Sequence, residues 1–180
     1  MGGAGAFRST SASTTRWGSP APCTCIAEAL RDLGDFERSA ELFARSIEIR
    51  RANGLDSGAA TVHSLGDLCL DAGDMPTAER YYREALALGL QEGDARLGAY
   101  CLAGLACVAA RNEDATAAGR LWTLAERLEH EIGFRMVAAE RIRYERNLTP
   151  PLANTDEYRA GIAGAANIDP LTAAAEIVNR

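Results

Sequence analysis

The sequence predicts an all-α fold in which antiparallel helix pairs stack into a right-handed solenoid. A unit of about 40 residues recurs, because the segment 59–88 aligns without gaps with the segment 99–128. Helix-period segments are separated by short stops that combine a glycine with an acidic residue, as at Gly73-Asp74 and Gly93-Asp94. No sustained alternation of apolar and polar residues indicates a strand. Repeats of this length in a helical pattern are typical of stacked helix pairs.

The two aligned copies share small residues at three places and an aromatic residue at a fourth, always at the same offset: Gly66 and Ala106, Ala78 and Ala118, Ala85 and Ala125, Tyr82 and Trp122. A larger side chain at the small positions would force neighbouring helices apart. Each aromatic side chain can bury ~150–250 Å² between layers. A weaker copy lies upstream at Gly34-Asp35-Phe36, Ser39, Phe43 and Ser46. One unit cannot cover its own apolar side, so neighbouring units are expected to complete the core.

Helical periodicity and stop signals divide the repeats into six helices. Gly34 ends the first helix at a position that needs left-handed backbone. Asp74 is a helix N-cap, and Pro76 stands in the first turn, where its missing N–H costs little. Gly93 repeats the stop, and Gly133 ends the last pair. The expected helices are residues 22–33, 36–52, 57–72, 75–90, 95–111 and 115–132.

Beyond Gly133 the repeat is lost and three further helices are predicted. One covers about residues 137–147, and one covers about 155–166 with Asn154 or Thr155 as its cap. The last starts at Asp169-Pro170, an N-cap followed by proline at the first helical position. Residues 1–20 are poor in large apolar groups and are expected to be disordered. The chain then divides into this segment, three helix pairs at 21–133 and closing helices at 134–180.

The pattern of small and aromatic residues resembles the tetratricopeptide repeat. That family carries small residues at its eighth, twentieth and twenty-seventh positions and an aromatic residue near the twenty-fourth. Gly66, Ala78, Ala85 and Tyr82 match all four places, and the following copy matches equally well, whereas the first copy has serine at two of them. The resemblance covers roughly residues 22–133, with a period longer than the family's usual 34. It implies a right-handed superhelical solenoid whose concave surface binds a protein or peptide partner.

A narrower resemblance extends further along the chain. Residues 102–110, 120–126 and 132–133 look like the last repeat of large bacterial signalling ATPases, the LuxR-type or cyclase-linked (STAND) regulators. The run 140–146, followed by Tyr158, Gly164 and Asp169, resembles the segment that closes those arrays. A Gly-x-x-x-x-Gly-Lys-Ser/Thr phosphate loop is absent, because the chain has no lysine. The resemblance therefore implies the sensor or scaffold portion of such a regulator.

Composition narrows the classes of function. The formal net charge is −6, which argues against direct nucleic-acid binding. All 19 basic residues are arginine. No segment approaches the roughly 20 apolar residues that span a bilayer, and the N-terminus has no secretory apolar run, so no membrane association is expected. The five cysteines show neither disulfide nor metal-site spacing. Reduced thiols in a cytoplasmic protein are therefore expected.

No residue pattern indicates catalysis, a metal or a cofactor. His63 and His130 are the only histidines, and neither belongs to a His-Glu-x-x-His motif. No Gly-x-Ser-x-Gly elbow is present. The acidic residues fall at helix caps and on faces expected to be exposed. We therefore expect the protein not to be an enzyme and to need no cofactor.

The tetratricopeptide resemblance assigns partner binding to the first helix of each pair. Carried over from the family's inward-pointing positions, the surface consists of Glu28, Arg31, Asp32, His63, Asp67, Asp71, Tyr100 and Arg111. Asp67 and Asp71 make its middle acidic, which favours a basic ligand end. The alternative is that these are ordinary solvated helix faces. The charged run with Arg141, Arg143 and Arg146 has two interpretations as well, a solvated helix face with local ion pairs or a docking surface for a neighbouring domain.

The expected function is non-catalytic protein–protein interaction, as a scaffold or regulatory module in bacterial signalling or transcriptional regulation. The alternative is a small-molecule effector-sensing module of a larger ATPase-type regulator, with its ligand in the concave groove. An enzyme with an unrecognised site is a third hypothesis. The first helix pair has no polar capping unit before it, so self-association through that pair is a further hypothesis.

Overall fold

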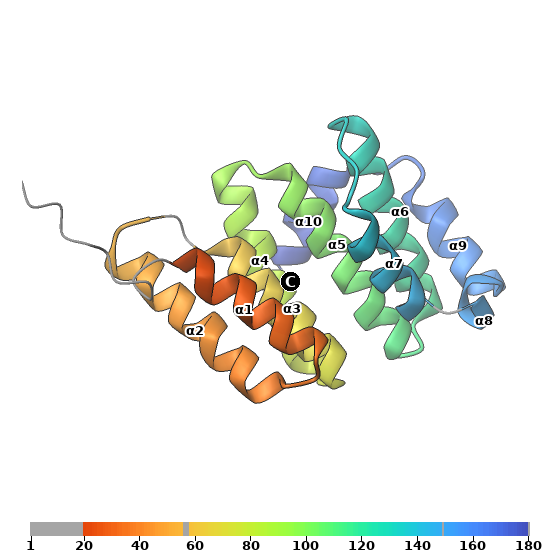
Figure 1. The fold of residues 1–180 in the computed structure, drawn as a ribbon. Helices are drawn as coiled ribbons and strands as arrows, with labels where there is room; N and C mark the ends of the chain where they lie inside the picture. Colours follow the sequence, from red (N-terminus) through yellow and green to blue (C-terminus); the bar gives the residue numbers. More distant parts are fainter. Residues whose placement is uncertain (1–19, 56–57, 149, 180) are drawn as a thin grey trace, which may run out of the picture.

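The computed structural model describes residues 20–55, 58–148 and 150–179, and every regular element in this part is an α-helix (Figure 1). Three antiparallel pairs come first: α1 (Pro20–Asp32) with α2 (Phe36–Ala52), α3 (Ala59–Ala72) with α4 (Met75–Glu92), and α5 (Ala95–Arg111) with α6 (Ala115–Glu131). Each pair packs on the next, α2 on α3 and α4 on α5. The predicted all-α solenoid of helix pairs is confirmed. The predicted disordered segment, residues 1–20, lies outside the described residues apart from the first residue of α1.

Further helices follow the pairs: α7 (Ala138–Asn147), α8 (Pro150–Ala153), α9 (Asp156–Ala165) and α10 (Pro170–Val178). α9 packs along α6, and α10 packs against α4, α5 and α6. α7 instead crosses the face of the solenoid in front of α5 (Figure 1). The three helices predicted in this region are present, and the single turn α8 is an addition that the sequence analysis does not predict.

Aspartate starts four helices of the repeats. In each case the side chain accepts a hydrogen bond from a backbone N–H two or three residues later, at Asp35, Asp74, Asp94 and Asp114. The residue before the first three is a glycine with a φ between 71° and 83°. Before the fourth it is Glu113, at a φ of 63°. A residue with a Cβ is disfavoured there by about 1 kcal/mol, so the last turn of the series is strained where the others are not.

Tyr82 lies at the centre of the core. It is fully buried, and its ring lies between Gly66 of α3 and Gly104 of α5. A Cβ added to Gly66 would come within 2.7 Å of the ring, and one added to Gly104 within 2.5 Å. Ala78 and Ala85 are fully buried as well. The prediction that small residues let helices approach around an aromatic side chain is confirmed.

The first pair accommodates its two serines by hydrogen bonding. Ser39 and Ser46 are fully buried where the other copies have alanine. The Ser39 hydroxyl donates to the Ala27 carbonyl at 2.7 Å, and the Ser46 hydroxyl lies 3.0 Å from that of Thr24. A buried hydroxyl with a partner costs little, so the departure from alanine does not open the pair.

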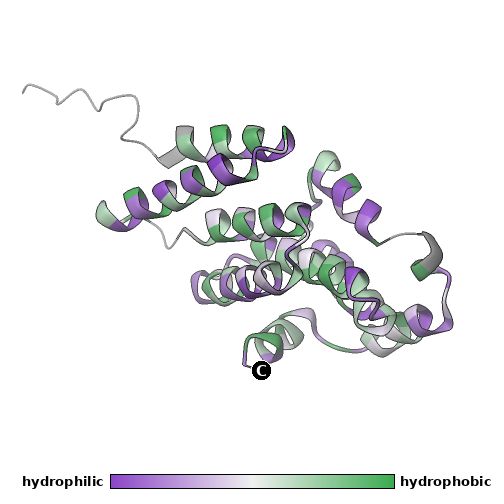
Figure 2. Cartoon of the chain, turned by 90° about the horizontal axis from the view of Figure 1, so that it is seen from below, coloured by the Kyte–Doolittle hydropathy of each residue, from purple (hydrophilic) through white to green (hydrophobic). Residues whose placement is uncertain are grey.

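The closing helices differ in polarity. Figure 2 shows α7 as mostly hydrophilic, whereas α10, beside the C-terminus, is mostly hydrophobic. No helix in the described part of the chain is both long and apolar enough to cross a bilayer. The contrast indicates that α10 is held by apolar burial and that α7 requires another kind of contact.

Candidate protein-binding face

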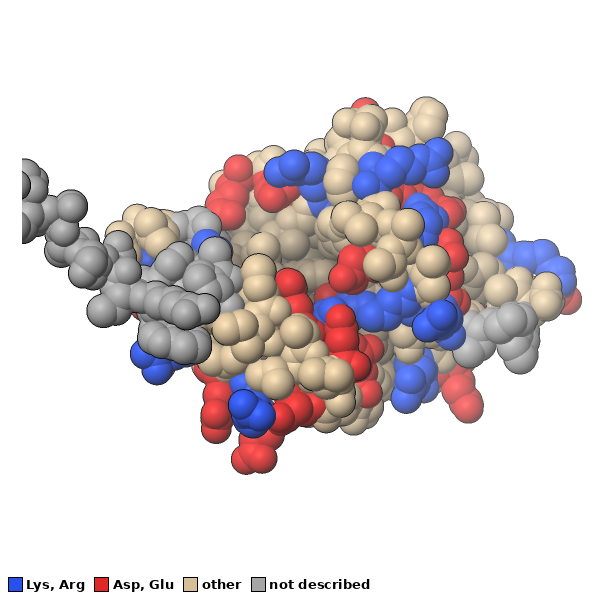
Figure 3. Space-filling model, in the orientation of Figure 1, with Lys and Arg blue, Asp and Glu red and all other residues tan. Residues whose placement is uncertain are grey.

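The residues predicted to contact a partner lie together on one side of the solenoid. We call this surface the inner face; α1, α3 and α5 contribute Glu28, Arg31, Asp32, His63, Asp67, Asp71, Tyr100 and Arg111 to it. On α3 the three members are four residues apart, which places them in one row along the helix. Arg31 of α1 reaches that row, and Tyr100 of α5 lies beside His63 with 5.7 Å between ring centroids. Figure 3 shows acidic and basic side chains close together on this side of the molecule, beside a hollow.

Asp67 of α3 is the centre of the inner face. Its side chain is buried, with 3 % of the residue exposed. One carboxylate oxygen, Oδ1, accepts hydrogen bonds from the hydroxyl groups of Tyr82 at 2.8 Å and Tyr144 at 3.0 Å. His63 Nε2 lies 3.1 Å from the same Tyr144 hydroxyl. Because that hydroxyl gives its proton to Asp67, the imidazole is the donor in this contact.

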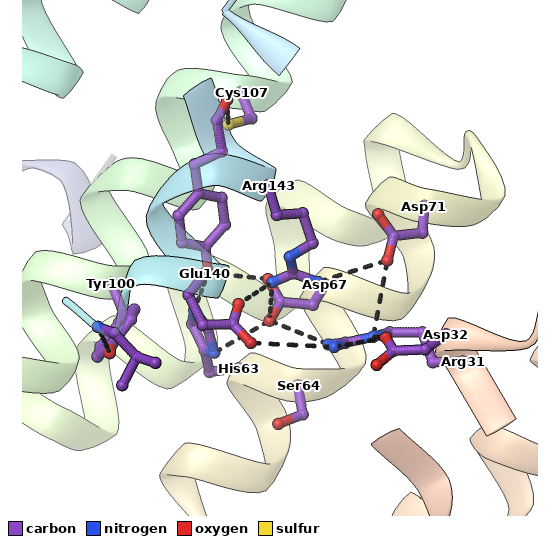
Figure 4. Close-up of polar contacts among 12 residues, drawn as sticks. Arg31, Asp32, His63, Ser64, Asp67, Asp71, Tyr100, Cys107, Glu140 and Arg143 are labelled. Atoms are coloured by element: carbon purple, nitrogen blue, oxygen red, sulfur yellow. Dashed lines mark hydrogen bonds and ion pairs between the residues drawn. The ribbon is translucent and has the colours of Figure 1, made fainter. Parts of the chain in front are cut away.

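The other oxygen of Asp67 faces two guanidinium groups (Figure 4). Arg143 Nη2 lies 2.5 Å from Oδ2, and Arg31 Nη1 lies 3.4 Å from it. Burial by itself would raise the pKa of Asp67, but the influence of His63, Arg143 and Arg31 outweighs burial and holds that pKa below its ordinary value. Asp67 is therefore a carboxylate at neutral pH, and it links α1, α3 and α7 at one point.

Two carboxyl groups at the edge of the inner face behave differently. Burial raises the pKa of Asp71, although Arg143 and Arg31 approach it to 3.4 Å and 3.7 Å. Burial also raises the pKa of Glu28 by more than nearby Arg31 lowers it. Burial is therefore the main cause of both raised pKa values, and the nearby arginines offset it only in part. By formal charge, the four carboxyl groups of the inner face outnumber Arg31 and Arg143, which lie among them.

α7 lies along the inner face from one end to the other. At its start, the backbone N–H of Val137 donates to the Tyr100 hydroxyl at 3.2 Å. At its end, Arg111 Nη1 donates to the side-chain carbonyl of Asn147 at 3.4 Å. Between these ends, Arg143 and Tyr144 hold the helix to α3, and Glu140 lies 4.0 Å from Arg31 of α1. The predicted inner-face residues thus contact a helix of their own chain.

The surface predicted to bind a partner is therefore covered by α7. Arg31, His63 and Asp67 are buried in the presence of α7, so no partner can touch them while α7 is in place. The basic group beside the acidic centre is Arg143 of the same chain, and binding of a basic ligand end stays a prediction. The repeat positions identify which residues gather on the face, but they carry no information about what covers it.

The charged run of α7 is not a solvated helix face. The Arg143 side chain is mostly buried, and Arg141 forms ion pairs with Glu129 and, at 3.4 Å, with Glu126 of α6. Arg146 alone among the three arginines of this run is exposed. The alternative interpretation, a docking surface for a neighbouring domain, stays a prediction. In this structure Arg143 contacts the inner face and Arg141 contacts α6 of the same chain.

Two residues that hold α7 in place were not predicted from the sequence. Tyr144 is fully buried, and Glu129 is buried and accepts a hydrogen bond from the Met136 N–H at 2.5 Å. The only signal for Tyr144 is an aromatic residue in a charged run, four residues after Glu140. Glu129 lies between charged neighbours and gives no signal at all.

The described residues provide no group of three or more His, Cys, Asp or Glu side chains that could hold a metal ion. Burial raises the pKa of the Cys101 and Cys107 thiols, so both are protonated and unreactive at neutral pH. Polar side chains of the inner face contact one another and α7. The chemistry that this arrangement can perform is recognition of a charged, hydrogen-bonding helix.

A separate pocket of about 560 Å³ lies away from the inner face, between α4, α5, α6 and α10. Leu105, Val108 and Ile177 give it apolar walls, and Arg83 and Arg120 add cationic groups. Arg83 is already engaged, because it pairs with Glu79 and donates to the carbonyl of Ile177. The pocket is therefore a mixed surface that α10 helps to close.

Comparison with known proteins supports the repeat in the first part of the chain. Residues 23–91, which cover most of α1 and the helices up to α4, match the family model of the tetratricopeptide repeat. Comparisons with curated proteins and with solved structures gave no match. Tetratricopeptide repeats generally mediate protein–protein interactions, and proteins built from them are typically non-catalytic scaffolds. The match and the stacked helix pairs together support a tetratricopeptide repeat protein with an all-α solenoid fold.

Proposed function

We propose that this chain is a non-catalytic interaction module that binds a peptide or a segment of a partner protein on its inner face. The observation that carries the proposal is the placement of α7, whose Arg143 forms ion pairs with Asp67 and Asp71. A helix of protein thus fits this surface, and it is held by side chains that the family's binding positions also select. The setting that we propose, bacterial signalling or transcriptional regulation in the cytoplasm, rests on the resemblance of residues 102–133 to signalling ATPases.

Charge supports a basic partner. Asp32 is largely exposed beside Arg31, and the inner face carries four carboxyl groups against two arginines. A positively charged segment approaching this edge gains electrostatic attraction, which speeds association and selects partners more than it adds affinity.

The test uses accessible residues of the inner face. A displayed library of random 16-residue peptides is selected on the full chain, and the selected peptides are then titrated against Asp32→Ser/Asp71→Ser. Replacing Asp67 would leave Arg31 and Arg143 without their central carboxylate and would confuse binding with stability. The matched control is Glu37→Ser/Glu157→Ser, which removes the same charge from exposed helix starts outside the inner face.

The expected result is that the selected peptides bind the wild type and the control equally and bind the inner-face variant about ten-fold more weakly or worse. Peptides that bind all three proteins alike would remove the inner face as the binding surface. Both variants are checked by circular dichroism, because a loss of helix would make the comparison meaningless.

A small-molecule effector is the second candidate, and the pocket beside α10 is the observation that favours it. The inner face is covered by α7. The pocket between α4, α5, α6 and α10 is large enough for a small-molecule ligand of a few hundred Å³. A metabolite panel screened by thermal unfolding tests this candidate, since a bound ligand raises the melting temperature. A stabilising compound must lose its effect in Ala109→Phe, which fills the pocket; if none does, the candidate fails.

A further inference from the structure

We infer that α7 occupies the partner site itself, and that the partner displaces α7 with a helix of the same chemistry: an arginine, a tyrosine directly after it, and a carboxylate three residues before it. This inference deepens the proposed function and rests on it. It names the ligand class and makes the free state of the chain a self-occupied one.

Helix geometry selects these three side chains. Glu140, Arg143 and Tyr144 are spaced i, i+3 and i+4, so they share one side of α7. Arg143 Nη2 lies 2.7 Å from Glu140, and Glu140 in turn lies 4.0 Å from Arg31 across the contact (Figure 4). Ile142, by contrast, is 48 % exposed. A partner helix is therefore recognised through one face and is free to vary on the other.

The site requires an arginine. Without α7, the inner face holds four carboxyl groups, Glu28, Asp32, Asp67 and Asp71, against two arginines. Arg31 is the one that pairs with Asp67 and Asp71, whereas Arg111 lies at the far end of α5. Arg143 pairs with two of these carboxylates through different nitrogen atoms, Nη2 with Asp67 and Nη1 with Asp71. A planar guanidinium can contact two carboxylates at once, whereas a lysine ammonium acts as a point charge and reaches them less well. A partner that removes Arg143 without replacing its charge would leave Asp67 poorly compensated.

The site also requires the tyrosine. The Tyr144 ring is fully buried, and its hydroxyl donates to Asp67 while it accepts from His63. The Arg143 guanidinium lies 5.0 Å from the centre of this ring, which adds a cation–π contact. A phenylalanine in this place would keep the ring and leave two polar groups of the inner face without that hydroxyl.

α7 is held loosely enough to exchange. It has ten residues and no side-chain N-cap, and helices of that length are marginal on their own. Tyr144 is its only buried residue. The Nε of Arg143 is buried with no hydrogen-bond partner in the described part of the chain, so the contact between α7 and the inner face leaves one buried donor unpaired. An incoming helix that makes the same ion pairs must offset the advantage of the tethered α7 through the additional contacts it makes.

The probe is a synthetic peptide with the sequence of residues 134–148, labelled with fluorescein for anisotropy. It is titrated against the full chain in three forms: wild type, Arg143→Ala, and the matched control Arg146→Ala, whose residue is exposed on α7. Arg143→Ala weakens the chain's own α7 and leaves every inner-face residue unchanged. Because an occupied site binds in proportion to the fraction that is vacant, this variant is expected to bind the peptide about ten-fold more tightly than the wild type, and Arg146→Ala is expected to match the wild type.

Changes in the peptide test the ligand class. Replacing the arginine that corresponds to Arg143 with alanine or lysine, or the following tyrosine with phenylalanine, is expected to weaken binding to the Arg143→Ala chain, by about ten-fold for alanine. The same alanine change at the arginine that corresponds to Arg146 is expected to have no effect. Equal binding of all these peptides would overturn the proposed chemistry.

Hydrogen exchange on the wild type gives a readout that does not depend on a folded variant. With saturating peptide, isotopically labelled so that its fragments differ in mass, residues 138–147 are expected to exchange faster while α9 keeps its protection. Unchanged protection of α7, or equal affinity for wild type and Arg143→Ala, would overturn displacement. The proposed function is judged separately by the library peptides: if these depend on Asp32 and Asp71 but leave α7 in place, partner binding stands and this inference falls.

Discussion

α7 and α9 are both ten-residue helices that close the solenoid, yet they are attached by different physics. α9 touches α6 backbone to backbone. A Cβ added to Gly161 would come within 2.1 Å of the Thr116 carbonyl oxygen, and one added to Gly119 within 2.3 Å of that of Tyr158. α7 contains no glycine, and it is held by the guanidinium groups of Arg141 and Arg143, by the Tyr144 hydroxyl and by hydrogen bonds at its ends.

This difference decides which helix can be exchanged. Contacts at van der Waals limits fit one backbone shape, and a different segment cannot reproduce them without equivalent glycines. Arg127 reinforces α9 by donating to the carbonyl groups of Ala165 and Ile168 at 2.7 Å and 2.6 Å. Ion pairs are less demanding, because any helix with the same charges at the same spacing satisfies them. The packing of α9 is therefore specific to its own backbone, whereas the ion pairs of α7 are contacts that another helix could reproduce.

The largest expected effect comes from removing the carboxylate on which both sides of the inner face depend. Asp67→Ala is expected to lower the free energy of unfolding by about 3–5 kcal/mol, because Arg31 stays buried beside a lost charge and two tyrosine hydroxyls lose their acceptor. Urea unfolding followed by circular dichroism measures it. Asp32→Ala, in an exposed ion pair with the same arginine, is the control and should change stability by less than about 0.5 kcal/mol. Similar losses for both variants would mean that burial at Asp67 does not matter.

A second variant tests the attachment of α9. Gly161→Ala is expected to lower the free energy of unfolding by about 2–3 kcal/mol, because its methyl group would collide with backbone that cannot move aside. Gly164→Ala in the same helix is the matched control. No atom lies within 4 Å of its added Cβ, so better helix propensity should stabilise the protein by about 0.5–1 kcal/mol. Opposite signs for two identical substitutions three residues apart would establish close packing; equal signs would refute it.

The fold could be predicted from the sequence because its determinants are local or periodic. Gly66 and Tyr82 belong to one repeat, and Asp74 and Asp94 cap the helices that directly follow them. The composition of the inner face followed in the same way, since repeat position specifies which side of a helix a residue occupies. These predictions required only that each unit resemble the next.

The covering of the inner face could not be predicted, because it depends on a contact between residues far apart that follows no repeat. Tyr144 and Asp67 are 77 positions apart, and no sequence pattern around either residue predicts their contact. The three α7 residues that face inward are polar or amphipathic, so an apolar stripe, the usual sign of a docking helix, is missing. A charged run that looks solvated and a charged run that meets complementary charge have the same sequence signature.

A third variant isolates the attachment of α7. Arg143→Ala is expected to destabilise the docked position of α7 by about 1.5–3 kcal/mol, the range for hydrogen bonds to charged groups. The loss should be seen as faster hydrogen exchange in residues 138–147, with α9 unaffected. Raising the salt concentration from 0.05 M to 0.5 M should act in the same direction on the wild type, though more weakly because the pairs are mostly buried. If α9 opened together with α7, the two helices would form one cooperative unit, and the conclusion that they are attached independently would be wrong.

Acid should release α7 only at low pH. The pKa of Asp67 is lowered on folding, so its contribution to stability is present above the ordinary carboxyl value and is lost as the pH falls through the lower, folded value. Asp71 and Glu28 have the opposite sign: their raised pKa values mean that the folded chain takes up protons more readily, which favours it as the pH falls through those values. Protection of α7 is therefore expected to persist from pH 7 to about pH 5 and to fall below about pH 4. Release of α7 between pH 6 and 5 would show that a group other than Asp67 controls its attachment.

The variant with the smallest expected effect distinguishes the global stability of the protein from the stability of the contact between α7 and the inner face. Glu113 begins the turn before α6 at a positive φ where the other copies have glycine, so Glu113→Gly should stabilise the protein by about 0.5–1 kcal/mol. The reverse change at an equivalent turn, Gly93→Ala, should destabilise it by about 1 kcal/mol, which calibrates the strain. α6 carries α9 through Gly119, so exchange in α9 should slow in proportion to the gain in global stability. Exchange in α7 should not change, because its opening breaks only the ion pairs and hydrogen bonds to its neighbours and leaves the turn before α6 intact. A slowing of α7 equal to that of α9 would mean that α7 leaves only when the solenoid unfolds, and displacement by a partner would then have no basis.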